Sequence, residues 1–304
     1  MKSIFHYLHP TYKRKATKVW KLLATTGSKW WSMDPFRQSA IIAYYTIFSL
    51  PALLVIIITI AGIAFGADVA NGKLLDQVKA TMGAETANQI KTMLAEATRS
   101  KLTVWATILG VITMLLGAIG VFVELQKTLN IIWEVEATLR KGVWGFMRSR
   151  IFSFGLILAI AFLLIISLVV STALAAAGSL LNAEESKILV LLFQIVNFFI
   201  SMGVISFLFA LMFKFLPDAN ITWRQVWLGA LLTGILFSFG KVALAFYFGK
   251  AEPGSGYGAA GSIVLILLWT SYSSMILFLG AEFTHTYADM YCGGVVAKST
   301  GKKV

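Results

Sequence analysis

One charged side chain interrupts an otherwise apolar run, and it has the clearest capacity for chemistry in the chain. Lys241 lies within residues 225–249, eight residues before the end of that run. If the run crosses a membrane, a rise of ~1.5 Å per residue places Lys241 ~12 Å below the membrane boundary. A lysine there costs roughly 2.5–3.5 kcal/mol to insert and tends to face a bundle interior or a watery cavity.

Three polar residues of neighbouring apolar runs are expected at about the same depth as Lys241. They are Gln194, Asn197 and Ser262. An ammonium group among neutral polar side chains would bind a phosphate or another anionic headgroup as a point charge. The alternative is that the long lysine side chain snorkels to the membrane surface and binds no substrate.

A second set of charged residues is expected where apolar runs meet the cytoplasm. Its members are Glu124, Glu282, Lys127, Lys214 and Arg224. Ion pairing at the membrane interface and an inner gate of salt bridges in a transporter both explain this set. Their predicted depth does not separate the two explanations.

The sequence lacks the residue patterns typical of an enzyme. It has three scattered histidines, one cysteine (Cys292), no GxSxG motif and no paired carboxylates within the apolar runs. A CxxC or Cys/His metal site is therefore excluded, and a histidine-rich metal centre lacks ligands. We expect no catalytic residue, no metal and no cofactor, and we interpret His285 as structural or interfacial.

Two segments are expected to shape the helices around these residues. The glycine-rich stretch 252–262, EPGSGYGAAGS, lacks the GK[ST] ending of a phosphate-binding loop. Its small residues favour close helix packing, with an unwound or re-entrant segment as the alternative. The glycines concerned are Gly254, Gly256, Gly258 and Gly261. Pro51 predicts a kink near the middle of the first apolar run.

Composition indicates that these residues lie in a membrane protein. Of 304 residues, 58% are hydrophobic and 13% are charged, whereas a soluble domain carries about 25% charged residues. Six apolar runs are long enough to cross a ~30 Å hydrocarbon core, and their continuous apolarity favours helices over a barrel. The predicted fold class is all-α, with spans at 41–66, 102–123, 151–181, 188–213, 225–249 and 257–281.

The distribution of basic residues predicts the orientation. The net charge is +12, and 18 Lys and Arg residues fall on the side that carries both termini, against seven on the other. The positive-inside rule therefore places both termini in the cytoplasm. We divide the chain into a basic segment at 1–40, a transmembrane domain at 41–285 and a cytoplasmic tail at 286–304.

Two segments outside the spans are expected to be helical. Apolar residues at helical spacing over 11–31 predict a basic amphipathic helix on the membrane surface, with tryptophans at headgroup depth. Its surface-binding residues would be Lys13, Arg14, Lys15, Lys18, Lys21, Trp20 and Trp30. The alternative is a charge cluster that only sets topology. The outer loop 68–101 predicts two short amphipathic helices divided at Gly83.

Four stretches resemble the YihY/BrkB family of bacterial inner-membrane proteins, over nearly the whole chain. They are AYYTIFSLPALL (43–54), QKTLNIIWEV (126–135), KFLPDANITWRQVWLGALLTGILFSFGK (214–241) and YGAAGSIVLILLWTSYSSMILFLGAEFTHTYA (257–288). The resemblance implies six transmembrane helices, an envelope role, and lipid or lipid A precursor transport. The family's old ribonuclease label conflicts with the scattered histidines. The resemblance supplies no catalytic residues.

The leading hypothesis is an inner-membrane protein of envelope biogenesis that transports or flips anionic lipids without hydrolysing ATP. The alternatives are a structural envelope scaffold, in which Lys241 only snorkels, and a small-solute transporter. Expected partners are anionic membrane lipids, together with a second copy of the chain or envelope proteins. Nucleic acid is not an expected partner.

Overall fold

The computed structural model describes residues 10–49, 104–135, 187–251, 261–294 and 296–297, with isolated positions between 72 and 92 and between 253 and 257. Regular structure in these residues is helical except for one pair of two-residue strands. The prediction of an all-α chain is therefore confirmed at the level of fold class.

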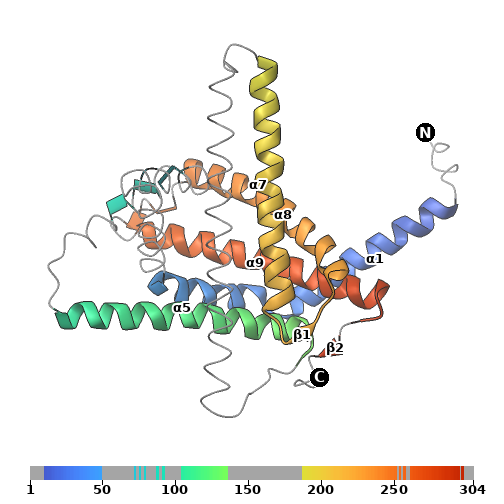
Figure 1. Ribbon diagram of the computed structural model, residues 1–304, viewed down its shortest axis with the longest axis horizontal. Coiled ribbons are helices and arrows are strands. Elements are labelled where there is room, and N and C mark those ends of the chain that lie inside the picture. The colour runs from blue at the N-terminus through green and yellow to red at the C-terminus, as the bar shows by residue number, and fades with distance from the viewer. Residues whose placement is uncertain are drawn as a thin grey trace.

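Five helices have both of their ends within the described residues. They are α1 (Pro10–Ser32), α5 (Val104–Ile132), α7 (Lys187–Phe215), α8 (Trp223–Ala251) and α9 (Gly261–Tyr291). Residues 35–49 are also helical. In Figure 1, α5, α8 and α9 follow the long axis of the view, α7 crosses them steeply, and α1 projects away on the right.

Three helices of the described part of the chain are long and apolar enough to cross a membrane. They are Leu191–Phe215, Trp223–Ala251 and Ile263–Tyr291, and they overlap the predicted spans 188–213, 225–249 and 257–281. The predicted span 151–181 and Pro51 lie outside the described residues. So does most of the loop 68–101.

Two helices continue beyond the spans expected from apolarity alone. Helix α5 ends at Ile132 rather than 123, and α9 ends at Tyr291 rather than 281. The extra turns carry polar residues, such as Asn130 and His285, that are only 2–3% exposed. Polar side chains that bond inside the protein do not end a helix, although they end an apolar run.

Helices α8 and α9 pack through two reciprocal glycine–threonine contacts. A Cβ added at Gly229 would overlap Thr284 Oγ1, and one added at Gly280 would overlap Thr233 Oγ1. Each threonine hydroxyl donates to the carbonyl four residues earlier on its own helix, at 2.6 Å for Thr233 and 2.7 Å for Thr284. Small residues at four-residue spacing thus allow close backbone approach, as in membrane helix pairs.

Helix 35–49 packs antiparallel against α5. Gly117 lies against Phe48 and Ser49, Gly120 lies against Tyr45, and Thr128 donates to Gln38 Oε1 at 3.2 Å. Helix α7 packs on α8 through Ser206 against Gly234 and through the ring pair Phe209–Phe237, whose centroids are 5.7 Å apart.

The buried core lies toward one end of the bundle. It is built from the end of α5, the end of α7, the start of α8 and the second half of α9, around Trp133, Phe213, Val226 and Phe278. Strands β1 (Ala219–Asn220) and β2 (Val296–Ala297) pair antiparallel at the same end. The loop between α7 and α8 is thereby tied to the segment after α9.

Large apolar side chains are exposed on α7 and on the second half of α8. They include Ile188, Leu191, Phe198 and Phe199 on α7, and Phe239, Val242 and Phe246 on α8. Exposed apolar surface on helices of this length is typical of lipid-facing segments. Buried polar side chains, in contrast, are concentrated at the core end.

Candidate functional site

Polar side chains gather where α5, α7 and α9 end and α8 begins. In this region Thr128, Asn130, Gln225, Glu282 and His285 are all at most 5% exposed. Buried polar groups at a helical core are costly unless they are hydrogen-bonded. Three connected groups of contacts satisfy most of them.

The first group ties α5 to the loop between α7 and α8. Asn130 Nδ2 donates to Asp218 Oδ2 at 3.1 Å, and the backbone N–H of Asp218 donates to Asn130 Oδ1 at 2.8 Å. Gln126 donates to the same carboxylate oxygen at 3.5 Å. Lys214 donates to the carbonyl of Ile221. The Asn130 and Gln126 bonds hold the loop against the end of α5, and the Lys214 bond ties it to the end of α7.

The second group starts α8 and links it to the C-terminal segment. Gln225 Oε1 accepts from the backbone N–H and the hydroxyl of Thr222, at 2.8 and 3.0 Å. This Thr-x-x-Gln spacing is a capping box, which satisfies backbone donors at a helix start. Gln225 Nε2 also donates to the carbonyl of Gly294 at 3.3 Å, so one side chain bonds both segments.

The third group is a row of ionisable residues on α9. His285 Nδ1 lies 3.8 Å from Glu282 Oε1, and His285 Nε2 lies 3.3 Å from Asp289 Oδ2. The side chains of Glu282 and His285 are 3% exposed, whereas that of Asp289 is 37% exposed. Trp133, at the end of α5, packs edge-on against the imidazole at 5.3 Å.

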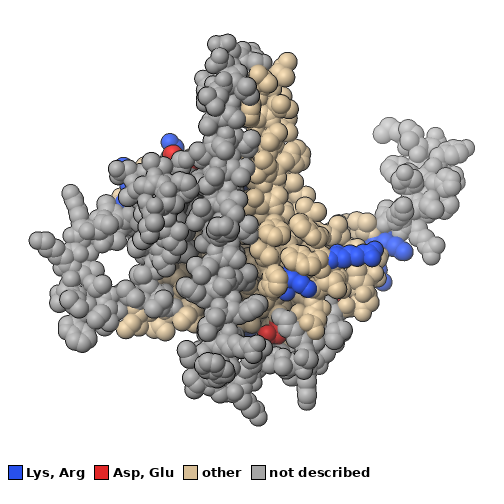
Figure 2. Space-filling view, in the orientation of Figure 1, with Lys and Arg blue, Asp and Glu red and all other residues tan. Residues whose placement is uncertain are grey.

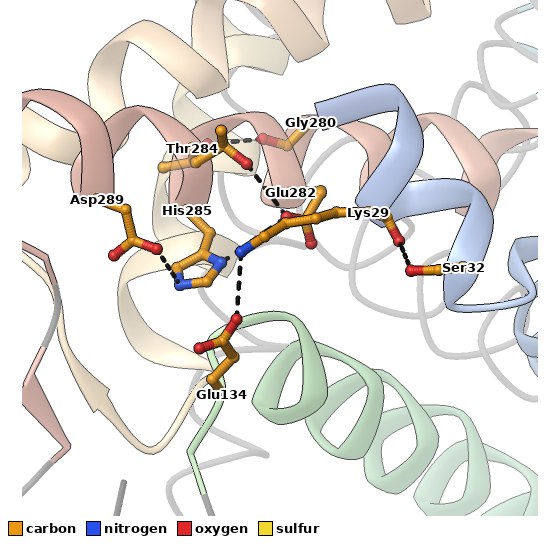
Figure 3. Close-up of polar contacts among 9 residues, drawn as sticks. Lys29, Ser32, Glu134, Gly280, Glu282, Thr284, His285 and Asp289 are labelled. Carbon is orange, nitrogen blue, oxygen red and sulfur yellow. Dashed lines mark hydrogen bonds and ion pairs between the residues drawn. The ribbon is translucent and has the colours of Figure 1, made fainter. Parts of the chain in front are cut away.

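Helix α1 reaches the same corner. Lys29 Nζ bonds Glu134 Oε1 at 3.2 Å, which joins α1 to the end of α5 beside the α9 row (Figure 3). Glu134 lies two residues beyond the end of α5 and has a positive φ of 51°. This pair is 38–48% exposed, so it contributes only about 0–1 kcal/mol.

The predicted inner set of five charged residues is distributed over separate contacts. Lys127 Nζ lies 3.6 Å from Glu124 Oε1, one turn away on α5. Lys214 bonds the loop, Glu282 accepts from Thr286 at 3.2 Å, and Arg224 is exposed. The contacts described among these residues do not join the five into one network, and their role as a gate stays a prediction.

The predicted headgroup cluster is described only in part. Lys241 is half-buried on α8 and Asn197 is exposed on α7. The side chains of Gln194 and Ser262 lie outside the description. The α7–α8 contacts described above, at Ser206–Gly234 and Phe209–Phe237, lie nearer the core end of both helices.

The surface of α1 divides into two faces. Leu22 and Thr26, which are 6% and 3% exposed, face the protein, whereas Val19, Trp20, Leu23 and Trp31 are 47–73% exposed. Lys18 and Lys21 are also exposed, and Figure 2 shows basic side chains on the part of the molecule that α1 forms. Trp30 packs against the core instead. The side chains of Lys13, Arg14 and Lys15 lie outside the description.

The glycine-rich stretch before α9 closes on itself. A Cβ added at Gly254 would lie 3.0 Å from the carbonyl oxygen of Gly261, so only small residues fit at these two positions. Tyr257 N donates to the Gly254 carbonyl at 3.1 Å, which makes a turn. Gly256 faces open space, and Gly258 lies outside the described residues.

Sequence reasoning missed most of the core-end network. Asn130, Asp218 and Gln225 were not singled out, although the Thr-x-x-Gln capping box was readable at 222–225. The Glu-x-x-His-x-x-x-Asp spacing of α9 was also readable, since residues three and four apart share a helix face. Among the described residues no group of three or more His, Cys, Asp or Glu is arranged to hold a metal ion.

Comparison with known proteins supplies a family assignment. The profile of the family described as Virulence factor BrkB matches residues 26–300. A UPF0761 membrane protein of Saccharophagus degradans is 24% identical over 83% of this chain and 56% of its own length. One from Verminephrobacter eiseniae is 27% identical over 63% of this chain and 44% of its own length.

The chain thus spans about half the length of these curated relatives. No solved structure matches the chain.

Proposed function

The chain belongs to the virulence factor BrkB family of membrane proteins, and from this premise we propose that it moves anionic lipids across the bacterial inner membrane. The substrates would be phospholipids or lipid A precursors, and the protein would act in envelope biogenesis without enzymatic activity. The proposal includes six transmembrane helices with both termini in the cytoplasm.

Lys241 is the observation that carries the proposal. It is half-buried on α8, ten residues before the helix ends at Ala251, which corresponds to ~15 Å. Ser238, one turn earlier on the same helix side, is 7% exposed, whereas Phe239 and Val242 are 72% and 64% exposed. Lys241 therefore lies at the border between packed protein and lipid-facing surface. A cation at such a border supports binding of a lipid phosphate while the acyl chains stay in the bilayer.

Two other features support the same proposal. The exposed tryptophans and lysines of α1 suit a helix at an anionic membrane surface, where each lysine contributes about 1 kcal/mol. The exposed apolar faces of α7 and α8 suit contact with acyl chains. Helix α1 would concentrate anionic headgroups near the protein, and Lys241 would bind one of them during transfer.

The experiment is lipid transfer in reconstituted vesicles that contain fluorescent phosphatidylglycerol. Lys241→Met keeps most of the side-chain volume and removes the charge, so insertion should persist while transfer falls at least several-fold. Lys241→Arg should retain part of the activity, because the charge remains and its geometry changes. Lys250→Met is the matched control, since it removes the same charge from the end of the same helix. Wild-type transfer by an inserted Lys241→Met protein would contradict the headgroup site.

A structural scaffold is the second candidate function. The Asn130–Asp218 bonds and the Gln225 bonds to two segments favour it, because they join helix ends rigidly. If the protein is a scaffold, vesicles that contain the wild type should transfer lipid no faster than protein-free vesicles. The Lys241 variants should give the same result. A small-solute transporter would instead carry solute flux that does not depend on anionic lipid.

A further inference from the structure

Four aromatic rings form a cluster on the outside of the core end, where α7 ends and α8 begins. Phe207 stacks on Trp223 with ring centroids 6.4 Å apart and an angle of 4° between the planes. Trp227 lies 6.1 Å from Phe207 and 6.4 Å from Trp223, and Phe215 meets Trp223 edge-on at 6.1 Å. Phe215, Trp223 and Trp227 are nevertheless 37–41% exposed. The rings therefore pack against one another and still present a surface to the outside.

The exposed side of α8 changes in polarity from its start toward its middle. Thr222, just before the helix, and Arg224, in its first turn, are exposed polar residues. Trp223 and Trp227 lie beside them, and the large exposed side chains that follow are apolar. These are Leu228, Leu231, Ile235, Phe239, Val242 and Phe246, which are 38–72% exposed. Polar, then aromatic, then apolar is the order met on passing from water into a bilayer.

The other end of α8 shows the same order in reverse. Tyr247 is 48% exposed, and Lys250 is exposed one turn later. Lys250 Nζ lies 5.8 Å from the centroid of the Phe246 ring. Between Trp227 and Tyr247 the sequence has a single charged residue, Lys241. Aromatic rings and a cation thus mark both ends of the apolar stretch.

The distance between the two aromatic ends matches the thickness of a membrane. Trp227 and Tyr247 are 20 residues apart, which corresponds to ~30 Å of helix and equals the ~30 Å of a hydrocarbon core. Tryptophan and tyrosine gather at both membrane interfaces because each has an apolar ring and one polar group. We propose that α8 crosses the hydrocarbon core between these two residues. The aromatic cluster, with Arg224 beside it, then binds the glycerol and phosphate groups of phospholipids in the leaflet at the core end.

The chemistry of this surface fits a phospholipid. The indole N–H groups of Trp223 and Trp227 are donors for ester and phosphate oxygens, and the guanidinium of Arg224 binds phosphate with two parallel hydrogen bonds. The cluster is continuous with the apolar side of α8. Its occupant must therefore be polar at one end and apolar over the rest of its length, as a phospholipid is.

The packing of α8 on α9 carries this boundary to the core end. Gly229 lies against Thr284, so Trp227 is level with Thr286 in this antiparallel pair. Strands β1 and β2 precede Trp227 and follow Thr286 in the chain, and they pair beyond this level. Much of the buried polar network thus lies at headgroup depth or outside the bilayer. Polar groups cost less there than in hydrocarbon.

The same placement gives Lys241 a depth. It lies six residues before Tyr247, which is ~9 Å inside the hydrocarbon core from the boundary opposite the core end. The phospholipid surface itself does not rest on the proposed lipid transport, because both of its tests work without lipid transfer.

The first measurement is the depth of spin labels along α8, in the full chain reconstituted in bilayers of phosphatidylethanolamine and phosphatidylglycerol. Single cysteines in a Cys292→Ser background carry a nitroxide. Power-saturation EPR compares collisions with oxygen, which concentrates in hydrocarbon, and with a water-soluble nickel chelate. The labelled positions are exposed and leave the aromatic cluster unchanged. They are Thr222, Leu231, Ile235, Phe239, Val242 and Lys250.

The ratio of oxygen to nickel collisions should be highest at Ile235 and Phe239, near the middle of the proposed span. It should fall at least several-fold at Thr222 and Lys250. Nickel collisions at Leu231 as frequent as at Thr222 would overturn the placement. An immobile label at Phe239 that is shielded from both reagents would show that a protein covers this face, which also contradicts the proposal.

The second measurement is the rise in melting temperature that phosphatidylglycerol produces in detergent-solubilised protein. The wild type should gain several degrees. Trp223→Leu and Trp227→Leu should each lose most of this rise, because leucine keeps an apolar surface but lacks the N–H donor. Phe239→Leu is the matched control, since it removes an exposed ring of the same helix away from the cluster, and it should keep the full rise.

Each rise is measured against the same variant without lipid, so a change in intrinsic stability does not enter the comparison. Equal rises in the wild type and both tryptophan variants, including no rise at all, would overturn headgroup binding by the cluster. An equal loss in Phe239→Leu would do the same, because the effect would then not be specific to the core end.

Discussion

At the scale of single residues, the core end depends on a few side chains with several bonds each. Asn130 uses both ends of its amide on Asp218, and Gln225 joins the start of α8 to Gly294. A buried group that loses its partner costs about 1–3 kcal/mol, more than the net gain from an ordinary hydrogen bond. These two residues are therefore sensitive positions for stability.

Asn130→Ala should destabilise the protein by about 1–3 kcal/mol, because it removes two bonds and leaves the Asp218 N–H without its partner. The apparent melting temperature in detergent should fall by several degrees. Asn220→Ala, at an exposed position of the same loop, should change it by less than one degree. Equal melting temperatures for Asn130→Ala and wild type would show that the loop is held by other contacts.

At the scale of secondary-structure elements, close backbone approach at small residues adds to the apolar core contacts between α8 and α9. Gly229, Thr233, Gly280 and Thr284 form the closest part of their interface, and a lone methyl group has no room there. Helix α1 follows a different principle, since only one face packs on the protein.

Gly229→Ala should destabilise the α8–α9 pair by about 1–3 kcal/mol, because overpacking forces the helices apart. Thr284→Ala in the same chain should recover part of this loss, since the hydroxyl that the new methyl group meets is removed. Gly203→Ala is the matched control, as a Cβ there meets nothing within 4 Å. Thermal unfolding in detergent measures all three, and an equal loss in Gly203→Ala would refute the interface explanation.

A peptide of residues 10–32 should gain helicity on anionic vesicles and much less on neutral ones. Its exposed Trp20, Leu23 and Trp31 supply the apolar face, and Lys18 and Lys21 supply charge. Replacing both lysines by glutamine should cost about 2 kcal/mol of binding at low salt. Circular dichroism and a co-sedimentation assay provide the measurement. Equal binding to both vesicle types would remove the electrostatic part of the proposal.

At the scale of the whole molecule, the ends of α5, α7 and α9 and the start of α8 meet at one end. This end carries Lys127, Lys214 and Arg224, so by the positive-inside rule we expect it to face the cytoplasm. Single cysteines at Ser3 and Ser299 in a Cys292→Ser background should resist an impermeant thiol reagent in whole cells. A cysteine at Ser186 should be labelled. If the cysteine introduced at Ser3 or at Ser299 is labelled from outside, the orientation is the opposite of the one predicted.

The sequence by itself determined the fold class, the family and three apolar helices, because long apolar runs and ordered motifs are local properties of the chain. It also located Lys241, since a charge within an apolar run needs no structure to be noticed. It did not determine where α5 and α9 end. Their last turns are polar, and only the tertiary structure supplies the partners that bury Asn130 and His285.

The tertiary structure alone also decided which residues meet. His285 lies four residues from Asp289 and more than 100 from Trp133, so the sequence spacing indicates the contact with Asp289 and not the ring contact with Trp133. Similarly, the Gly229–Thr284 contact depends on the register between two helices, which is set by the sum of their side-chain contacts. Residues on one helix share a face by geometry, whereas residues on different helices are brought together only by packing.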